Sequence, residues 1–318
     1  MLVVAGDALV DLVGDAGHVY RAHPGGSCFN VAMALGRLGL YVGFASPLSG
    51  DALGRLLAAT LVRSGVKVLF ADPVAAPTPL AVVSIDAGGS ATYAFYRERT
   101  ADRTVSATGL EAVLPPHPGL YHIGSLALIG ADDSAHWLDA ARVARDRGAV
   151  ISLDPNVRAG LIDDLDDYRR RMEAAFALAD IVKISDEDLE VLSPGETAED
   201  AFEAMRRRHD PAVAVLTRGK LGAIGVSAAG VRVAQAAIMS GPMVDTIGAG
   251  DSLQAGLLWA IHDMGLLDRD RLVAISEAQL ADALEVGALA AGIDCTREGA
   301  DPPWKDELRQ AIDARRQR

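Results

Sequence analysis

The chain has 318 residues and is 50% apolar, which is enough to bury a substantial hydrophobic core. Its formal charge of −13 argues against a nucleic-acid partner, because phosphate binding requires an excess of Lys and Arg. No apolar run approaches the roughly 18 residues of a membrane helix, and the first residues lack a basic secretory segment, so we expect a cytoplasmic protein without membrane contact.

Short β-branched segments alternate with longer segments rich in Ala and Leu along most of the chain. The segments that predict strands are residues 2–5, 41–45, 119–123, 149–153, 181–184 and 212–217. The segments that predict helices are residues 29–38, 51–64, 134–147, 166–178, 198–208, 250–263, 277–291 and 305–315. A repeated strand–helix order is typical of a mostly parallel sheet covered by helices on both faces, so the predicted class is α/β.

Two stretches interrupt this order. Residues 13–22 and 81–96 alternate apolar with polar positions, which predicts antiparallel strands, and Gly88-Gly89 predicts a turn in the second stretch. The sequence contains no Pro/Ser-rich linker and no sustained repeat. We therefore expect one domain over residues 1–318, with a small inserted β-sheet lid at about 12–24 and 78–101.

The strongest functional motif is Asp-Thr-Ile-Gly-Ala-Gly-Asp-Ser at residues 245–252, where a helix is predicted to begin. Gly248 and Gly250 let backbone N–H groups approach an anion, and the helix dipole adds positive potential there. Asp251 would face the same anion, which is unfavourable for a carboxylate unless it accepts a proton from an attacking hydroxyl. The motif therefore predicts a phosphate site with a catalytic base beside it.

A second motif, Pro-Gly-Gly-Ser-Cys-Phe-Asn-Val-Ala, occupies residues 24–32 at another predicted helix start. Gly25 and Gly26 would let the main chain lie against a sugar, and Asn30 offers both a donor and an acceptor to hydroxyl groups. With the Gly-Gly motif near the start of the chain and the Gly-Ala-Gly-Asp motif near its end, the two motifs resemble the signatures of the ribokinase-like (PfkB) family of carbohydrate kinases. The resemblance implies a ribokinase-like fold, ATP and Mg²⁺ as cofactors, and a small-molecule sugar as the acceptor.

The resemblance also implies roles for individual residues. Asp251 corresponds to the catalytic base, and the amides of Gly248, Ala249 and Gly250 correspond to the hole for the transferred phosphate. Asp11 falls where the family places a carboxylate that holds sugar hydroxyls, a role suited to Asp because its two oxygens accept two hydrogen bonds.

Residues 154–158, Asp-Pro-Asn-Val-Arg, resemble a fructokinase segment that faces the reacting phosphate. Arg158 is therefore the expected cationic stabiliser of the transferred charge. Residues 183–188 correspond to the family's Asn-x-x-Glu element, which supports the magnesium and phosphate network, and Lys183 begins this segment. Here Ser185 replaces Asn and Asp188 replaces Glu, so the reach is shorter and Asp188 is expected to act on magnesium through water.

Residues 217–223 look like the family's Thr-x-Gly-x-x-Gly turn, which contacts the nucleotide. The residues implied are Thr217, Gly219 and Gly222. Residues 295–300 resemble a loop that, with main-chain oxygens of Asp245 and Ile247, holds a potassium ion in some family members. Because carbonyl ligation leaves no side-chain signature, the need for potassium stays open.

The motifs are closest to those of fructokinases, so fructose is the expected substrate. Residues 93–103 resemble a lid strand from which an aromatic side chain and an arginine, here Arg97, approach the sugar. Arg97 also leaves a 2-keto-3-deoxygluconate kinase open, because it would pair with a sugar-acid carboxylate. A ribokinase is disfavoured by Leu9, which stands where an Asn would contact ribose, and a nucleoside kinase by the 5% aromatic content.

Two rival classes remain beside the kinase. A sugar-binding sensor with impaired catalysis is favoured by the departures at Ser185 and Asp188 and opposed by the intact Asp251. A dinucleotide-dependent oxidoreductase is disfavoured because residues 6–9 lack the Gly-x-Gly-x-x-Gly turn. The strand edges of the lid predict a homodimer formed through the lid.

Overall fold

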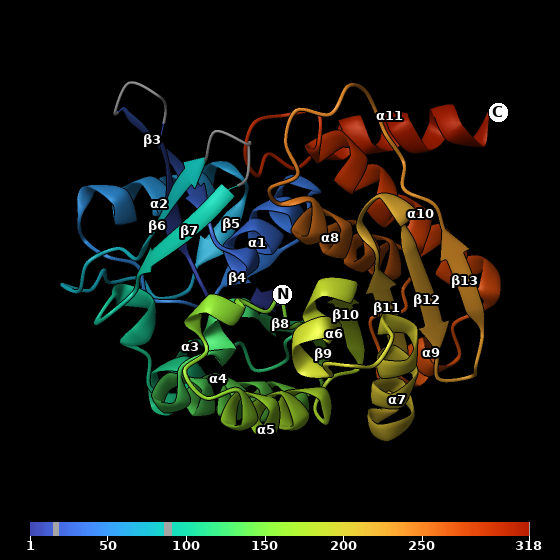
Figure 1. Ribbon diagram of the computed structural model, residues 1–318, viewed down its shortest axis with the longest axis horizontal. Coiled ribbons are helices and arrows are strands. Elements are labelled where there is room, and N and C mark those ends of the chain that lie inside the picture. Colours follow the sequence, from blue (N-terminus) through green and yellow to red (C-terminus); the bar gives the residue numbers. More distant parts are fainter. Residues whose placement is uncertain (15–18, 86–90, 318) are drawn as a thin grey trace.

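The computed structural model describes residues 1–14, 19–85 and 91–317 (Figure 1). Its main feature is a nine-stranded sheet in the order β13-β12-β11-β10-β9-β8-β1-β4-β5. The predicted strands form its parallel centre, namely β1 (Leu2–Val4), β4 (Val42–Phe44), β8 (Leu120–Gly124), β9 (Val150–Asp154), β10 (Ile181–Ser185) and β11 (Val213–Thr217). The α/β class is therefore confirmed.

Three strands of this sheet were not predicted, and all lie toward its two edges. They are β5 (Val66–Val68), β12 (Ala223–Ser227) and β13 (Arg232–Gln235). β12 and β13 continue the sheet in the antiparallel sense beyond β11. Each is short or contains Ala and Gly, so its local sequence gives little strand signal.

Helices cover both faces of the sheet (Figure 1). The predicted ones are α1 (Ser27–Arg37), α2 (Ala52–Arg63), α4 (Ala131–Asp146), α5 (Leu165–Phe176), α7 (Ala198–His209), α8 (Ala249–Asp263), α10 (Glu277–Asp294) and α11 (Lys305–Arg316). Three shorter helices were missed, namely α3 (Ala107–Val113), α6 (Asp186–Leu192) and α9 (Arg269–Val273). No helix in the described part of the chain is long and apolar enough to cross a membrane.

The core consists of two apolar clusters, one on each face of the sheet. Leu2 and Val4 of β1 belong to the cluster that includes buried residues of α1, α8 and α10. Val3 and Ala5 belong to the other, which includes residues of α4, α5 and α7. Successive side chains of a strand point to opposite faces, so the near-continuous apolar strands serve both clusters. Because the central strands run parallel, the polar residues that follow them lie together at the carboxyl ends of the strands.

A separate four-stranded sheet forms the lid, in the order β3-β2-β6-β7. β2 (Leu9–Gly14) pairs antiparallel with β3 (Tyr20–Gly25), and β6 (Leu80–Ile85) pairs antiparallel with β7 (Ala91–Tyr96). The two hairpins join through β2 and β6, which run parallel. The predicted Gly88-Gly89 turn lies outside the described residues.

Candidate active site

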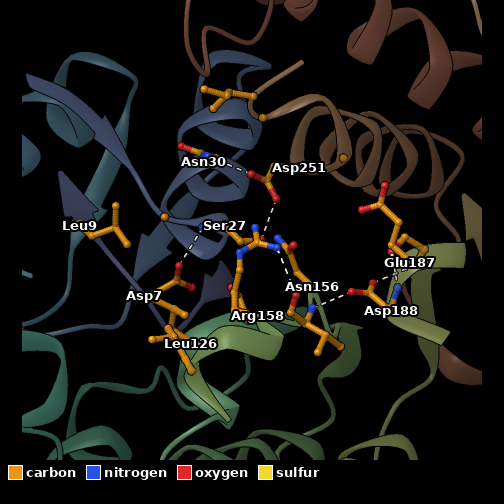
Figure 2. A pocket seen from close by; sticks show the side chains of 18 of the residues that line it. Asp7, Leu9, Ser27, Asn30, Leu126, Asn156, Arg158, Glu187, Asp188 and Asp251 are labelled. Carbon is orange, nitrogen blue, oxygen red and sulfur yellow. Dashed lines mark hydrogen bonds between the residues drawn. The ribbon is translucent and has the colours of Figure 1, made fainter. Parts of the chain in front are cut away.

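A cavity of about 940 Å³ lies at the carboxyl ends of the central strands (Figure 2). Its walls come from the segments at the ends of β1, β8, β9, β10 and β11, from the first turns of α1 and α8, and from lid strands β2 and β7. The predicted residues that line it are Asp11, Gly26, Asn30, Arg158, Lys183, Ser185, Asp188, Thr217, Ile247, Gly248, Gly250 and Asp251. Six predicted residues do not line it, namely Gly25, Arg97, Gly219, Gly222, Asp245 and Ala249.

The N-terminus of α8 presents free amides at the cavity wall. Gly248 is the N-cap with φ 81°, and a Cβ there would lie 2.6 Å from the Cβ of Ala300, so only glycine fits. No N-cap side chain binds the amides of this helix. The first i to i−4 bond runs from the amide of Ser252 to the Gly248 carbonyl, which leaves the amides of Gly250 and Asp251 without helical acceptors. This end of α8 is suited to an anion.

The Asp251 carboxylate is held in place by α1. The Ser27 hydroxyl donates to Oδ1 at 2.6 Å, and the Asn30 amide donates to Oδ2 at 2.8 Å (Figure 2). Burial raises the pKa of Asp251 to about 7, although the Ser27 and Asn30 hydrogen bonds oppose that shift. A carboxylate with such a pKa can take a proton from a hydroxyl near neutral pH.

Asn30 thus donates to the Asp251 carboxylate, a contact that the sequence did not predict. Its Oδ1 has no hydrogen-bond partner in the described part of the chain. Ser27 also received no role from the sequence, although it stands inside the glycine motif. Its contact with Asp251 spans 224 positions and depends on the packing of α1 against α8.

The Asp7 carboxylate caps the N-terminus of α1 from the segment after β1. Its Oδ2 accepts the Ser27 amide at 2.8 Å and its Oδ1 accepts the Cys28 amide at 3.4 Å. Gly26 has φ 105°, and a Cβ there would lie 2.9 Å from the Asp7 carbonyl oxygen. Burial raises the pKa of Asp7. Sequence reasoning missed this residue, although an acid just after the first strand of a parallel sheet was the available signal.

Asp11 extends from β2 into the same end of the cavity. Burial and the neighbouring Asp7 charge raise its pKa to about 6. A Cβ on Gly25 would overlap the Asp11 Oδ2 atom, so this glycine makes room for the carboxylate. Gly25 therefore acts on the site through Asp11, whereas the sequence placed it against the sugar.

Two cations, Lys183 and Arg158, line the described part of the cavity. The Lys183 amine lies 2.9 Å from Oδ2 of Asp154, and both side chains are buried. Burial disfavours the charged amine, but the adjacent Asp154 carboxylate outweighs it and holds the pKa of Lys183 above its usual value. Arg158 is exposed and extends into the cavity from the loop after β9 (Figure 2).

Ser185 and Asp188, the two departures from the family pattern, form a capping box at the start of α6. Ser185 accepts the Asp188 amide, and Asp188 Oδ2 accepts the Ser185 amide, both at 3.0 Å. Asp188 Oδ1 accepts the Val157 amide at 2.6 Å and so ties α6 to the loop that carries Arg158. No group of three metal-ligating side chains gathers among the described residues. Glu187, which the sequence did not assign, also lines the cavity.

The predicted nucleotide and potassium segments flank the N-terminus of α8. Thr217 ends β11 and lines the cavity, while residues 219–222 form the turn after it, closed by the Arg218 amide on the Gly222 carbonyl at 2.8 Å. Asp245 Oδ1 accepts the Ile247 amide and Oδ2 accepts the Gly299 amide, both at 3.0 Å. The structure therefore brings 245–247 beside 295–300.

Arg97 differs from its expected position. Its Nε donates to Asp102 Oδ2 at 2.6 Å, and a second guanidinium nitrogen lies 3.4 Å from Asp133 Oδ2. The side chain is 10% exposed and does not line the cavity. In this geometry the guanidinium serves an ion-pair cluster at the base of the lid and offers nothing to a sugar.

Comparison with known proteins agrees with this site. The profile described as "pfkB family carbohydrate kinase" matches residues 1–307. The chain belongs to this family. It is accordingly an ATP-dependent carbohydrate kinase, and the resemblance drawn from the two glycine motifs is confirmed.

Curated pfkB relatives of similar length include several fructokinases. The chain is 32% identical to a fructokinase of Rhizobium leguminosarum bv. trifolii, covering 100% of this chain and 92% of the relative. It is 33% identical to a fructokinase of Klebsiella pneumoniae, covering 97% and 98%.

Solved structures of two kinases share the fold over nearly the whole chain. Aminoimidazole riboside kinase from Salmonella enterica, complexed with aminoimidazole riboside and an ATP analogue, superposes with a TM-score of 0.82 at 28% identity, covering 97% of this chain and 98% of that one. Fructokinase from Xylella fastidiosa with bound ATP gives a TM-score of 0.90 at 23% identity, covering 99% and 98%. The second likeness supports the ribokinase-like fold alone.

Proposed function

We propose that this pfkB kinase transfers the γ-phosphoryl group of ATP to a hydroxyl of fructose. The observation that carries the proposal is the Asp251 carboxylate, held by Ser27 and Asn30 beside the open N-terminus of α8. Curated relatives at 32% and 33% identity are named fructokinases, which supports fructose as the acceptor.

The proposed reaction combines the acids, the cations and the open N-terminus of α8 that line the cavity. Asp11, Gly26, Asn30 and the missed Asp7 lie where the sugar hydroxyls would bind, and Asp251 takes the proton of the attacking hydroxyl. The hydroxyl oxygen forms a bond to the γ-phosphorus as the bond to the bridging oxygen of ADP breaks. The amides of Gly250 and Asp251 donate to the transferred phosphoryl oxygens, and Arg158 balances their charge.

Mg²⁺ and K⁺ are part of the proposal. Each oxygen of Asp188 already accepts a backbone amide, which suits a magnesium ion that keeps most of its own water and is held through it. The ion supplies charge neutralisation to the nucleotide phosphates when bound. The carbonyl oxygens of Asp245 and Ile247 are the candidates for potassium, beside residues 295–300.

The experiment compares fructose with the other candidate phosphoryl acceptors. The structural likeness to a riboside kinase favours a ribosyl substrate as second candidate, while Leu9 lines the cavity as an apolar residue in place of a polar ribose contact. A coupled ADP-release assay on fructose, ribose, aminoimidazole riboside and 2-keto-3-deoxygluconate separates these acceptors. We expect the highest kcat/KM with fructose, and a requirement for Mg²⁺. Sugar binding without turnover on any acceptor would instead support the sensor.

We also propose a homodimer formed through the lid. Tyr20 on β3 and Tyr96 on β7 are 53% and 62% exposed, and these strands are the two edges of the lid sheet. Exposed aromatic side chains on a strand edge favour pairing with a second copy. Analytical ultracentrifugation at micromolar concentration tests this, and a monomer alone would remove it from the proposal.

A further inference from the structure

Arg97 directly follows lid strand β7, whose Ala94 and Phe95 line the cavity. Its guanidinium nevertheless pairs with Asp102 in η1 (Ala101–Arg103) and with Asp133 in the first turn of α4. The Asp102 and Asp133 side chains are 1% and 4% exposed. The Arg97 guanidinium is therefore held at the base of the lid and does not line the cavity beside this strand.

The cluster around Arg97 is internally satisfied. Thr100 donates its hydroxyl to Asp102 Oδ1 at 2.6 Å, which leaves Oδ2 for Arg97. Arg103 lies 3.5 Å from Asp133 Oδ2 and shares that carboxylate. A buried guanidinium leaves such partners only when another anion replaces them at comparable distance, because an unpaired buried charge is costly.

The sugar end of the cavity is acidic. Asp7 and Asp11 both lie there, and Arg97 is close enough for its charge to oppose the rise in the pKa of Asp7. Among the described residues that line the cavity, the cations are Arg158 and Lys183, and Lys183 is paired with Asp154. A carboxylate on the substrate would thus face two acids at the sugar end. Arg158, whose charge opposes the rise in the pKa of Asp11, is the cation there without an ion-pair partner among the described cavity residues, and the proposed reaction uses it for the transferred phosphoryl group.

We infer that Asp102 makes this kinase selective for neutral sugars over sugar acids by holding Arg97 out of the cavity. The inference rests on the proposed function, since it takes the cavity to be the sugar site. Asp102 acts through Arg97 and touches no substrate, so it is a positioning residue. The inference also revises the role of Arg97, which we expected from the sequence to be a partner for a sugar carboxylate.

The test compares binding of a neutral sugar and a sugar acid. Asp102→Asn removes the charge, keeps the volume and retains an acceptor for Thr100. Isothermal titration with fructose and with 2-keto-3-deoxygluconate gives the ratio of the two Kd values for each variant. Wild type is expected to bind fructose at least about tenfold more tightly, and Asp102→Asn to shift the ratio toward the acid by at least about tenfold.

Two further variants assign the effect to Arg97. Arg97→Met in the Asp102→Asn background is expected to abolish the shift. Asp139→Asn is the matched control, because it removes a carboxylate from an exposed Asp–Arg pair with Arg142 on the same α4, and it is expected to leave the ratio unchanged. If Asp102→Asn does not fold, Asp133→Asn is expected to shift the ratio in the same direction.

The inference is overturned by a wild-type preference for the acid, by an unchanged ratio in a folded variant, or by a shift that persists without Arg97. Binding is measured separately from turnover, so the two proposals fail differently. Fructose binding with no phosphorylation would contradict the proposed function. The ratio of Kd values would then still test whether Asp102 sets the preference for neutral sugars. Absence of binding by both ligands would overturn both.

Discussion

The N-termini of α1 and α8 are alike in sequence and differ in what occupies them. Each helix follows a glycine with positive φ, 105° at Gly26 and 81° at Gly248. At α1 the first amides are taken by the Asp7 carboxylate, whereas no N-cap side chain binds those of α8. The same turn chemistry therefore produces an internally satisfied helix start in one place and a helix start with open amides, suited to an anion, in the other.

The two helix starts also depend on each other. α1 packs against α8, and Ser27 and Asn30 from the satisfied start hold the Asp251 carboxylate of the open one. α1 therefore positions a carboxylate at the N-terminus of α8, whose open amides alone would favour an anion. Substitutions that break the contacts between α1 and the Asp251 carboxylate should therefore lower turnover more than they lower the stability of the fold.

The largest effect is expected from Asp251→Asn, which leaves the open end of α8 without its base. The turnover number should fall by about two to four powers of ten, with little change in sugar KM, because general-base catalysis contributes that much. Steady-state ADP release measures it. Asp263→Asn, at the exposed end of the same helix, is the control, and turnover of Asp251→Asn within about tenfold of wild type would remove the catalytic assignment.

The two helix starts also show what the sequence could predict. Glycine turns followed by helical periodicity predicted both, and Asp251 was assigned from its place in the first turn. The contact from Ser27 to Asp251 was out of reach because it joins residues 224 positions apart through helix packing. Asp7 was missed since its role as a cap depends on where β1 meets α1.

Arg97 shows a different limit. The sequence predicted its charge near the sugar, and the structure turns the guanidinium away because Asp102 and Asp133 are nearer partners. Residue type indicates what a side chain can bind, whereas packing at the base of the lid decides which partner it meets. Short edge strands such as β5 and β13 were missed because pairing with a neighbour, and not local pattern, stabilises them.

A smaller effect is expected from Ser27→Ala, which removes the hydrogen bond from α1 to Asp251. That bond opposes the rise in the pKa of Asp251, so its loss should raise this pKa further and leave less carboxylate at pH 7. We expect kcat/KM at pH 7 to fall about three- to tenfold and to recover partly at pH 8.5. Ser134→Ala, a buried serine on α4, is the control, and equal losses at both pH values would contradict the account.

The last effect concerns stability and not turnover. Asp294 is a buried acid whose Oδ2 would lie 3.1 Å from a Cβ on Gly248. Burial raises the pKa of Asp294 to about 7, so the folded state binds its proton more tightly than the unfolded state and loses stability as pH rises from about 4 to 7. Asp294→Asn should therefore raise the free energy of unfolding by about 1–4 kcal/mol at pH 8.

The pH dependence of the free energy of unfolding distinguishes the loss of the Asp294 charge from a change in side-chain packing. The gain from Asp294→Asn should shrink as pH falls from 7 toward 4, because the wild-type carboxyl becomes neutral in the folded state. Urea unfolding at pH 8 and pH 5 measures it. A gain of equal size at both values would show that the charge of Asp294 is not the reason.

We propose Asp251 as the base of sugar phosphorylation, because burial between α1 and α8 raises its pKa to about 7. The pH profile of kcat/KM with fructose tests it most directly. We expect kcat/KM to fall about tenfold per unit below pH 7, and Asp251→Asn to lose this inflection along with most of its activity. A wild-type profile that stays flat between about pH 5.5 and 8.5, or an inflection that survives in Asp251→Asn, would contradict it.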